Sequence, residues 1–391
     1  MQRRRFCRYT VLGTVALASS LSQNITAMSA EVQSTKSRHQ WVVLYWMPYD
    51  NNLSHFGEPI TEMLVRATKD SSVVVAIQSD YWGDSEMRRR QLADGGVYEL
   101  SVSGEDSSDV SSLSSYLHWA HQKFEADHWA VIVVGHGGKI NEVSPDDHRV
   151  IPEEPTTWMG VDEFTAAIAD FNQAISDRVE LLFFQNCNKA TLEVIYEARN
   201  CSRYTLASQL NLGAPNYYYE EFLNRLTDSS ATGYDAALAI INAERADMYH
   251  SLTLVDNQAV KRLSEILSPA VRALLDSNLS DVILPNLPTY WYFDEQHCDA
   301  IALLEHLASV AGRGKDEVSE FAEFLQSDVI VEHRTGGELY HPLSREASYT
   351  GLCGLSLYLP ENKEAALRYR NLALYQEVDL LNLYQGIVGG V

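Results

Sequence analysis

The chain has 391 residues, of which 46% are hydrophobic, and its formal net charge is −23. This length and apolar content suffice for one large α/β domain with additions, or for two domains. A surface this acidic repels nucleic acid and anionic lipid, so we expect no nucleic-acid partner. The same charge attracts basic peptides or proteins at long range, and it is equally consistent with simple solubility.

The first 30 residues have the pattern of an export signal. Four arginines within residues 1–8 precede an apolar stretch at 11–21, which is too short to span a bilayer. Small residues around Ala27 and Ala30 offer a cleavage site. We therefore predict a signal peptide at 1–30, a linker at 31–40, and a secreted or periplasmic mature protein without a membrane span.

From Trp41 onward, strand-like runs alternate with helix-like segments. Short apolar runs separated by helices indicate right-handed βαβ crossovers, and hence a three-layer α/β fold around a mostly parallel sheet. The predicted strands lie at 41–47, 72–78, 130–134, 179–184 and 204–208, with a β-hairpin at 87–92 and 96–100 and helices at 60–68, 111–124, 162–175 and 190–199.

One predicted loop, at 139–158, is unusually long for a fold of this kind. It is polar, carries three prolines and several acidic residues, and is expected to be exposed. Exposed loops of this composition are common sites of proteolytic processing, and some act as lids.

Beyond residue 220 the chain is predicted to be mainly helical. Helices are expected at 220–226, 234–249, 257–275 and 300–310, and a late strand at 354–359. We therefore predict an α/β core at 41–225 and a helical C-terminal part at 226–391 that packs on it. The late strand could extend the same sheet, and a separate second domain is the alternative.

Two of the predicted strands end in residues that can support nucleophilic catalysis. His136 lies between glycines after the strand at 130–134, and Cys187 follows the strand at 179–184. Ligands and chemistry in open α/β sheets sit beyond the carboxyl ends of parallel strands, so both side chains are expected at one edge. An imidazole there can raise the thiolate fraction of a thiol, which is typical of a cysteine hydrolase.

Each of these two residues also has a simpler interpretation. His136 could belong to an ordinary glycine-rich turn, and Cys187 could be a buried core thiol. The position of Cys187 favours catalysis, because Lys189 and a helix expected to begin near Ala190 would lower the pKa of the thiol. The backbone N–H of Gly137 could bind a developing oxyanion.

The other cysteines of the mature chain are too few for a disulfide framework. Cys201, Cys298 and Cys353 allow at most one disulfide if Cys187 is free, and buried thiols are the simpler expectation. No cysteine spacing indicates zinc, so we predict no metal and no cofactor.

At these residues the chain resembles the clostripain family of cysteine peptidases, in the wider group with caspases, legumains and gingipains. The resemblance covers roughly residues 41–385. It is carried by Asp50-Asn51-Asn52-Leu53, by Gly135-His136-Gly137-Gly138, by Cys187 followed by the segment 193–197, by Ala207-Ser208, and by the segments 251–256 and 354–360.

The resemblance implies a caspase-like sandwich and hydrolysis of peptide bonds in peptide or protein substrates. It implies a catalytic dyad of His136 and Cys187 with no obligatory third member. The backbone N–H groups of Gly137 and Cys187 would bind the oxyanion, and Gln185, Ser208 and Gln209 would contact the substrate. The segment after the catalytic histidine is often processed in such relatives, and Arg149-Val150 is a possible cut here.

Two departures from the family pattern bear on specificity. The family commonly has an aspartate two residues before the nucleophile, where this chain has Gln185, and an acidic residue after Ala-Ser, where it has Gln209. Losing these carboxylates removes the charged pairing that selects arginine or lysine, so we expect a primary specificity other than strict Arg/Lys. Alternatively, other acids of this acidic chain could supply the charge.

Two further functions stay open at this point. The chain could be a catalytically silent, peptidase-like binding protein, or it could use the same dyad as a transpeptidase or amidase. Calcium dependence, known in some relatives, has no defined ligand motif in this sequence, and the oligomeric state is not readable from it.

Overall fold

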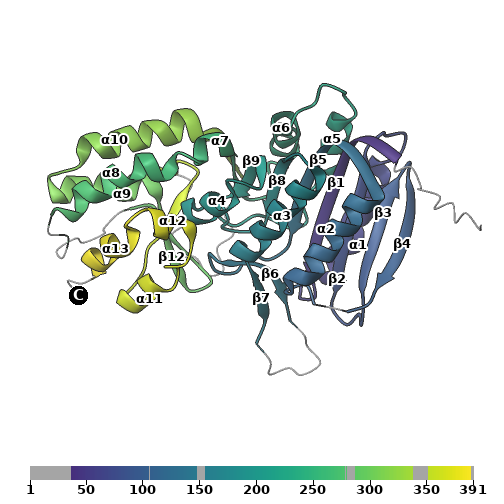
Figure 1. Cartoon of the computed structure of the whole chain (residues 1–391), viewed down its shortest axis with the longest axis horizontal. Coiled ribbons are helices and arrows are strands. Elements are labelled where there is room, and N and C mark those ends of the chain that lie inside the picture. The colour runs from purple at the N-terminus through teal and green to yellow at the C-terminus, as the bar shows by residue number, and fades with distance from the viewer. Residues whose placement is uncertain are drawn as a thin grey trace, which may run out of the picture. The chain divides into compact units, whose positions relative to one another are not determined.

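A nine-stranded sheet runs through the computed structural model of the chain (Figure 1). The structure describes residues 37–104, 106–147, 155–277, 279, 287–337 and 351–388, which all fall within the unit Lys36–Val391. The predicted signal peptide and the possible cut at Arg149-Val150 lie outside the described residues. The first strand begins at Ser37, inside the predicted linker, because residues 37–46 pair with the neighbouring strand β5.

The five central strands of this sheet are parallel, and the two strands at each side of them are antiparallel. Every residue of β2 and β8 is buried, which explains the apolar runs 74–77 and 181–184 within them. In spatial order the strands are β13 (Ile330–Gly336), β10 (His250–Asp256), β9 (Ser202–Ser208), β8 (Val179–Gln185), β5 (Phe124–Val134), β1 (Ser37–Tyr49), β2 (Val74–Tyr81), β3 (Met87–Ala93) and β4 (Gly96–Val102).

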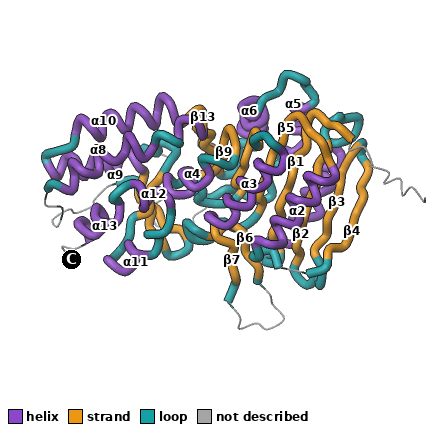
Figure 2. Tube along the Cα trace, in the orientation of Figure 1, coloured by secondary structure: helices purple, strands orange, loops and turns teal. Residues whose placement is uncertain are grey.

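Helices cover both faces of the sheet, which confirms the predicted three-layer α/β fold (Figure 2). The apolar sides of the helices and the two faces of the sheet form two separate clusters of buried side chains. One face packs against α1 (Ser54–Ala67), α5 (Tyr219–Leu226) and α6 (Gly233–Ala243), and the other against α2 (Val110–Lys123), α3 (Val161–Ile175) and α4 (Leu192–Ala198).

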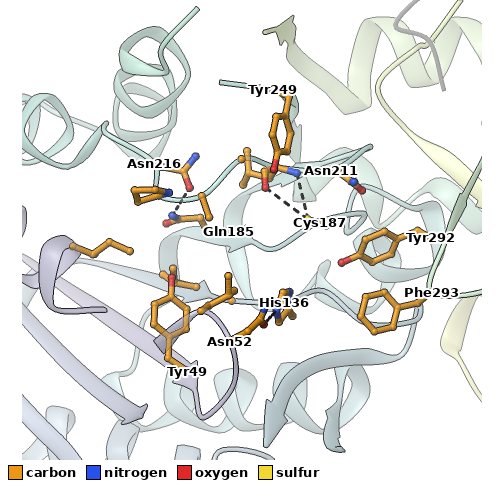
Figure 3. A pocket seen from close by; sticks show the side chains of 18 of the residues that line it. Tyr49, Asn52, His136, Gln185, Cys187, Asn211, Asn216, Tyr249, Tyr292 and Phe293 are labelled. Carbon is orange, nitrogen blue, oxygen red and sulfur yellow. Dashed lines mark hydrogen bonds between the residues drawn. The ribbon is translucent and has the colours of Figure 1, made fainter. Parts of the chain in front are cut away.

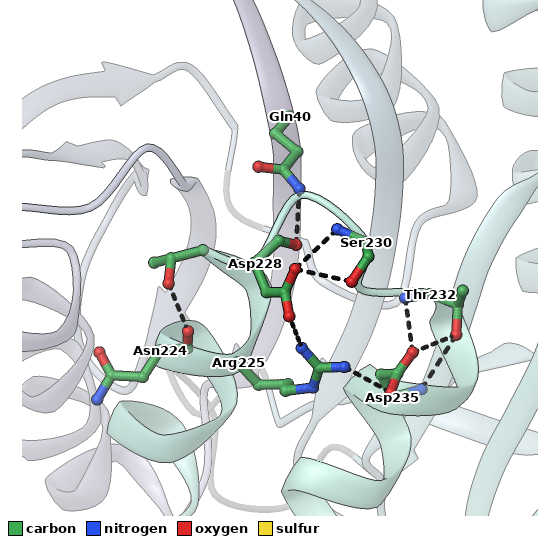
Figure 4. Close-up of polar contacts among 8 residues, drawn as sticks. Gln40, Asn224, Arg225, Asp228, Ser230, Thr232 and Asp235 are labelled. Atoms are coloured by element: carbon green, nitrogen blue, oxygen red, sulfur yellow. Dashed lines mark hydrogen bonds and ion pairs between the residues drawn. The ribbon is translucent and has the colours of Figure 1, made fainter.

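The connection between α5 and α6 shows how local sequence fixes a helix start against the sheet (Figure 4). Thr232 Oγ1 accepts a hydrogen bond from the Asp235 N–H at 3.3 Å, and the Asp235 carboxylate accepts one from the Thr232 N–H at 3.0 Å. This reciprocal capping satisfies two backbone donors at the start of α6. Gln40 of β1 donates to the Asp228 carbonyl at 2.8 Å, which anchors the connection.

The C-terminal part contains a second, three-stranded sheet. It consists of β11 (Thr289–Tyr292), β12 (Glu295–Asp299) and β14 (Ser356–Tyr358). The predicted late strand is therefore present, but it pairs with β12 and does not extend the main sheet. The remaining helices are α7 (Asn257–Val260), α8 (Leu263–Leu275), α9 (Ala300–Ala311), α10 (Lys315–Phe324), a π-helical turn η1 (Leu325–Val329), α11 (Lys363–Leu367), α12 (Ala373–Glu377) and α13 (Leu380–Val388).

The part beyond residue 225 is less helical than predicted. β10 and β13 both extend the main sheet, so the predicted boundary at 225 does not coincide with the edge of that sheet. The predicted helix at 234–249 ends at Ala243, and the one at 257–275 is two helices separated by Lys261 and Arg262. Apolar runs as short as 250–256 do not distinguish a strand from a buried helix by periodicity alone.

The expectation of an exposed loop at 139–158 is wrong for residues 143–147, which are buried, and holds for residues 155–157, which are exposed. Residues 142–146 form β6 (Glu142–Asp146), which pairs with β7 (Thr157–Gly160). Asp146 and Asp147 are buried, and both carboxylates have hydrogen-bond partners. That of Asp146 accepts the Ser107 N–H at 2.8 Å, and that of Asp147 accepts the Thr156 hydroxyl at 2.6 Å. Carboxylates can be buried in this way when hydrogen bonds offset the loss of hydration, so acidic residues alone did not indicate an exposed loop.

Two negative findings concern the described residues. No helix in this part of the chain combines the length and the apolar character needed to cross a bilayer. The four cysteines of the same part, Cys187, Cys201, Cys298 and Cys353, are all free thiols.

Candidate active site

The register of two parallel strands brings His136 and Cys187 to one edge of the main sheet. β5 and β8 are neighbours, and their last paired residues are Val134 and Gln185. His136 and Cys187 each follow two residues after this pair, so the two chains carry them past the end of the sheet together. The predicted placement at the carboxyl ends of adjacent parallel strands is what the structure has.

The segments that carry the two residues touch through their backbones. A side chain on Gly137 would place its Cβ 2.1 Å from the Cys187 carbonyl oxygen, so only glycine fits there. The Gly135 N–H also donates to the Gln185 carbonyl at 3.3 Å. The need for glycine beside His136 is thus a close approach of two backbones and not a special backbone angle.

A pocket of about 940 Å³ opens at this edge, and both His136 and Cys187 line it (Figure 3). Its wall is largely apolar, with polar side chains at a few positions. The lining residues are Tyr49, Asn52, Leu53, Ile60, Val134, Gly135, His136, Gln185, Cys187, Asn211, Leu212, Gly213, Ala214, Pro215, Asn216, Tyr249, Trp291, Tyr292, Phe293 and Asp294. A mostly apolar pocket with a few convergent polar groups is typical of a substrate site.

The ring of His136 is held by Asn52, which follows the end of β1. His136 Nε2 and Asn52 Oδ1 are 2.7 Å apart, so Nε2 carries the proton and donates it to the amide oxygen. This contact fixes the tautomer in which Nδ1 is the basic nitrogen. Burial lowers the pKa of His136 below its ordinary value, and the charge of Asp147 partly opposes this.

The thiol of Cys187 is not activated in the way that the sequence predicts. Burial raises its pKa above the ordinary value, although the backbone of Leu212, the Tyr292 hydroxyl and the charge of Lys189 act in the opposite direction. The Leu212 N–H lies 3.4 Å from Cys187 Sγ. The helix expected near Ala190 begins at Leu192 and is only seven residues long. Desolvation therefore outweighs these hydrogen bonds and the cation.

Gln185 lies in the pocket wall, but its own hydrogen-bonding groups are occupied. Its Nε2 donates to Asn216 Oδ1 at 2.6 Å and to the Tyr219 hydroxyl at 2.9 Å. Its Oε1 accepts from the Tyr218 hydroxyl at 2.5 Å. Asn216 in turn donates to a Glu244 carboxylate oxygen at 2.8 Å. Gln185 is thus bound on all sides by uncharged side chains, and the network ends at the Glu244 carboxylate behind Asn216.

The model of the clostripain family matches residues 45–382 of the chain. The chain belongs to the clostripain family. It is therefore a cysteine-type peptidase, as the resemblance of its motifs implied. A comparison with curated proteins found no significant match.

Solved structures support the clostripain-like fold. An inactive zymogen C11 protease from Parabacteroides distasonis is 14% identical, has a TM-score of 0.69, and is matched over 88% of this chain and 99% of that one. A secreted C11 cysteine protease from Bacteroides thetaiotaomicron, in complex with an irreversible peptide inhibitor, is 16% identical with a TM-score of 0.66 and the same coverage. At these identities the likeness shows the fold alone.

Two residues that the family resemblance suggested as substrate contacts lie elsewhere in this clostripain-family chain. Ser208 and Gln209 are fully buried and do not line the pocket. Ser208 Oγ accepts the Ser251 N–H at 3.3 Å, and Gln209 Nε2 donates to the Asp299 carboxylate at 3.2 Å. Gln209 is turned toward the C-terminal part by this bond, so its side chain is unavailable to a substrate in the pocket.

Several pocket residues of this clostripain-family chain were not singled out from the sequence as site residues. Asn52 could have been found, because it follows a parallel strand at the same sheet edge as His136. Leu212, Asn216 and Tyr292 carry no such signal. They come from connections after β9 and from the β11–β12 hairpin, which reach the pocket only in the folded chain.

Proposed function

We propose that this chain is a secreted cysteine endopeptidase with Cys187 as nucleophile and His136 as general acid and base. The observation that carries the proposal is the convergence of His136 and Cys187 on one pocket, with the backbone of Gly137 packed against that of Cys187. Such a site can bring a thiol, an imidazole and backbone N–H donors to one bound amide.

The chemistry follows from two side chains that are neutral in the free protein. Cys187 Sγ attacks the scissile carbonyl carbon while its proton passes to His136, and the backbone N–H groups of Gly137 and Cys187 bind the oxyanion. The C–N bond then breaks, and His136 gives the proton to the leaving amine. A water molecule attacks the resulting thioester, His136 accepts its proton, and the acid product leaves as the thiol is restored.

The wall of the pocket supports a preference for uncharged side chains on the acyl side of the cleaved bond. Gln185 stands where clostripain relatives commonly have an aspartate, and its amide is saturated by its neighbours. Among the described residues that line the pocket, Asp294 is the only carboxylate, and it lies in the exposed turn of the β11–β12 hairpin. Deep in the pocket, a lysine or arginine would meet no carboxylate in the wall itself, since Glu244 lies behind Asn216 and already accepts a hydrogen bond from that amide.

Cleavage of a diverse peptide library tests this proposal. Cys187→Ala should lower the rate of hydrolysis at least about a thousandfold, because the nucleophile is lost. Cys353→Ala, which removes another half-buried thiol, should leave the rate unchanged. The cleaved sites of the native chain should carry apolar or neutral polar residues before the scissile bond.

The possible results separate the alternatives. Hydrolysis that survives Cys187→Ala would contradict the proposed catalytic dyad. Cleavage restricted to arginine and lysine would contradict only the proposed preference for uncharged side chains. A native chain that neither cleaves peptides nor reacts with a thiol-directed peptide probe would be a binding protein. Amide products formed with an added amine would indicate a transpeptidase.

Secretion is supported by the composition of residues 1–30 and by the description of one structural neighbour as secreted. The export signal predicts that the protein recovered outside the cytoplasm begins near residue 31. N-terminal sequencing of the protein from fractionated producing cells checks this, and a cytoplasmic chain that retains Met1 would contradict it.

A further inference from the structure

Two side chains that flank the nucleophile both bind the segment that carries the histidine. Asn186 Nδ2 donates to the Gly135 and His136 carbonyls at 3.1 and 2.9 Å. Lys189 Nζ donates to the Lys139 and Ile140 carbonyls at 2.6 and 3.3 Å. Asn186 and Lys189 thus grip the segment 135–140 at both ends, and we refer to this pair as the clamp.

The backbone hydrogen bonds of the main sheet do not hold the segment 135–140 in place. β5 and β8 are paired only as far as Val134 and Gln185, and the Gly135 N–H makes the last backbone hydrogen bond between them. Beyond that point the histidine segment contains three glycines, which are the residues with the most backbone freedom to lose. Without side-chain contacts, nothing in the ladder would set the position of His136 relative to Cys187.

We infer that Asn186 and Lys189 are positioning residues, which hold the imidazole of His136 in register with the thiol of Cys187. This rests on the proposed function, since it assigns a role within the same reaction. Proton transfer between two side chains requires them to stay within about 3 Å of each other, so small displacements of one segment are costly in rate.

The buried amide of Asn186 destabilises the folded state. The side chain is 1% exposed, and its Oδ1 is buried without a hydrogen-bond partner among the described residues. A buried acceptor that is left unsatisfied destabilises the folded state, so stability alone does not favour asparagine at this position.

Lys189 is fully buried and is faced by acids from two different strands. The carboxylates of Glu142 of β6 and Glu295 of β12 attract the charge of Lys189, and Cys187 lies close enough to interact with it. Burial and the charge of Lys189 lower the pKa of His297 of β12. The same two acids accept the backbone N–H groups of Lys139 and Ile140, at 2.7 and 3.2 Å. Both the N–H and the C=O groups of residues 139 and 140 are therefore bound by the side chains of this cluster.

The clamp predicts a loss of turnover without a matching loss of stability. Asn186→Ala and Lys189→Met should each lower kcat for the best library peptide about thirtyfold or more, with KM changed less than about threefold, because substrate binding is left intact. Asn186→Ala should keep the melting temperature of the native chain, since it also removes the unsatisfied oxygen. Lys189→Arg, which keeps N–H donors at the end of a long side chain, should retain most of the activity.

Asn257→Ala is the matched control for Asn186→Ala. Asn257 is also a fully buried asparagine whose Nδ2 donates to a backbone carbonyl, that of Ser202 at 3.0 Å, but it is the first residue of α7 and does not line the pocket. Its Oδ1 also lacks a hydrogen-bond partner among the described residues, so Asn257→Ala should affect the melting temperature about as Asn186→Ala does, and it should leave kcat unchanged. Asn186→Ser, which is too short to reach both carbonyls, should behave like Asn186→Ala and provides a second variant.

A second readout separates positioning from simple structural support. The pH profile for alkylation of Cys187 by iodoacetamide should stay in place in Lys189→Met while kcat falls, because burial lowers the pKa of Lys189 to about 7 and its amine is uncharged where the thiol ionises. Clamp variants that keep native kcat would overturn the inference while the proposed function stands. If the native chain itself cleaves no peptide, the proposed function and the inference about Asn186 and Lys189 are both wrong.

Discussion

Burial acts on the two reacting side chains in ways that keep both of them neutral. It raises the pKa of the Cys187 thiol and lowers the pKa of His136. The free protein should therefore hold a thiol and an imidazole near neutral pH, and not a thiolate paired with an imidazolium. The attack on a substrate then has to include the proton transfer, which is why the tautomer set by Asn52 matters.

The alkylation of Cys187 should follow the ionisation of a single hindered thiol. Because only the thiolate reacts, the rate constant with iodoacetamide should climb about tenfold per pH unit from pH 6 and still be rising at pH 9. His136→Ala should leave this profile nearly unchanged. A plateau of reactivity between pH 5 and 7, lost in His136→Ala, would show a preformed ion pair and contradict the neutral dyad.

The β11–β12 hairpin contributes residues 291–294 to the wall of the pocket. Its turn residues Phe293 and Asp294 have left-handed backbone angles, φ 47° and 60°, as two-residue hairpins of this twist require. The ring of Phe293 packs edge-on against Trp158 at 5.9 Å. Tyr292 precedes the turn, faces the pocket, and its hydroxyl interacts with Cys187 and with the backbone of Gly137 (Figure 3).

Tyr292 should restrict access of a peptide to the thiol. In Tyr292→Ala, the rate constant for a peptidyl chloromethyl ketone, divided by that for iodoacetamide, should rise about tenfold, which corresponds to about 1.4 kcal/mol. The ratio cancels any change in thiolate content, since both reagents report it. Tyr249→Phe, which alters another tyrosine of the pocket, serves as the control. A ratio that falls would mean that Tyr292 helps to bind peptide.

On the scale of the whole molecule, α4 joins the two sheets. It follows the Cys187 segment, and just before it the Ala190 carbonyl accepts the Ser356 N–H of β14 at 3.0 Å. Within the helix, the Glu193 carboxylate accepts the Tyr358 N–H at 3.0 Å, and its other oxygen has no partner among the described residues. Burial raises the pKa of Glu193 to about 7. The nucleophile segment is thus held between the main sheet and the C-terminal part.

Glu193 should make the fold less stable as the pH rises. An acid whose pKa is raised by folding keeps its proton in the native state between about pH 4.5 and 7, so stability falls through that window and is level above it. Glu193→Gln imitates the protonated form and should unfold like the native chain at pH 5. At pH 8 it should be more stable by up to about 3 kcal/mol in urea titrations.

A matched substitution separates this titration from a general effect of charge. Exposed Glu364→Gln, on α11, should show the same difference from the native chain at both pH values. If Glu193→Gln gives a pH-independent change as well, the buried carboxyl is not the titrating group.

The sequence by itself determined the central strands, their mostly parallel arrangement and the two strand ends that carry His136 and Cys187. These features are local, because continuous apolar runs identify strands buried on both faces, and the period of the strands fixes which residues follow them. The glycine beside His136 was also readable, although its reason, the backbone of Cys187, was not.

Only the tertiary structure decided the surroundings of these residues. Asn52, Leu212 and Tyr292 meet the dyad from segments far apart in the chain, and Gln209, expected at the substrate, is turned away by Asp299. The predicted activation of the thiol failed for the same reason. A pKa depends on burial and on every neighbouring charge, and both are set by packing between distant segments that no local pattern records.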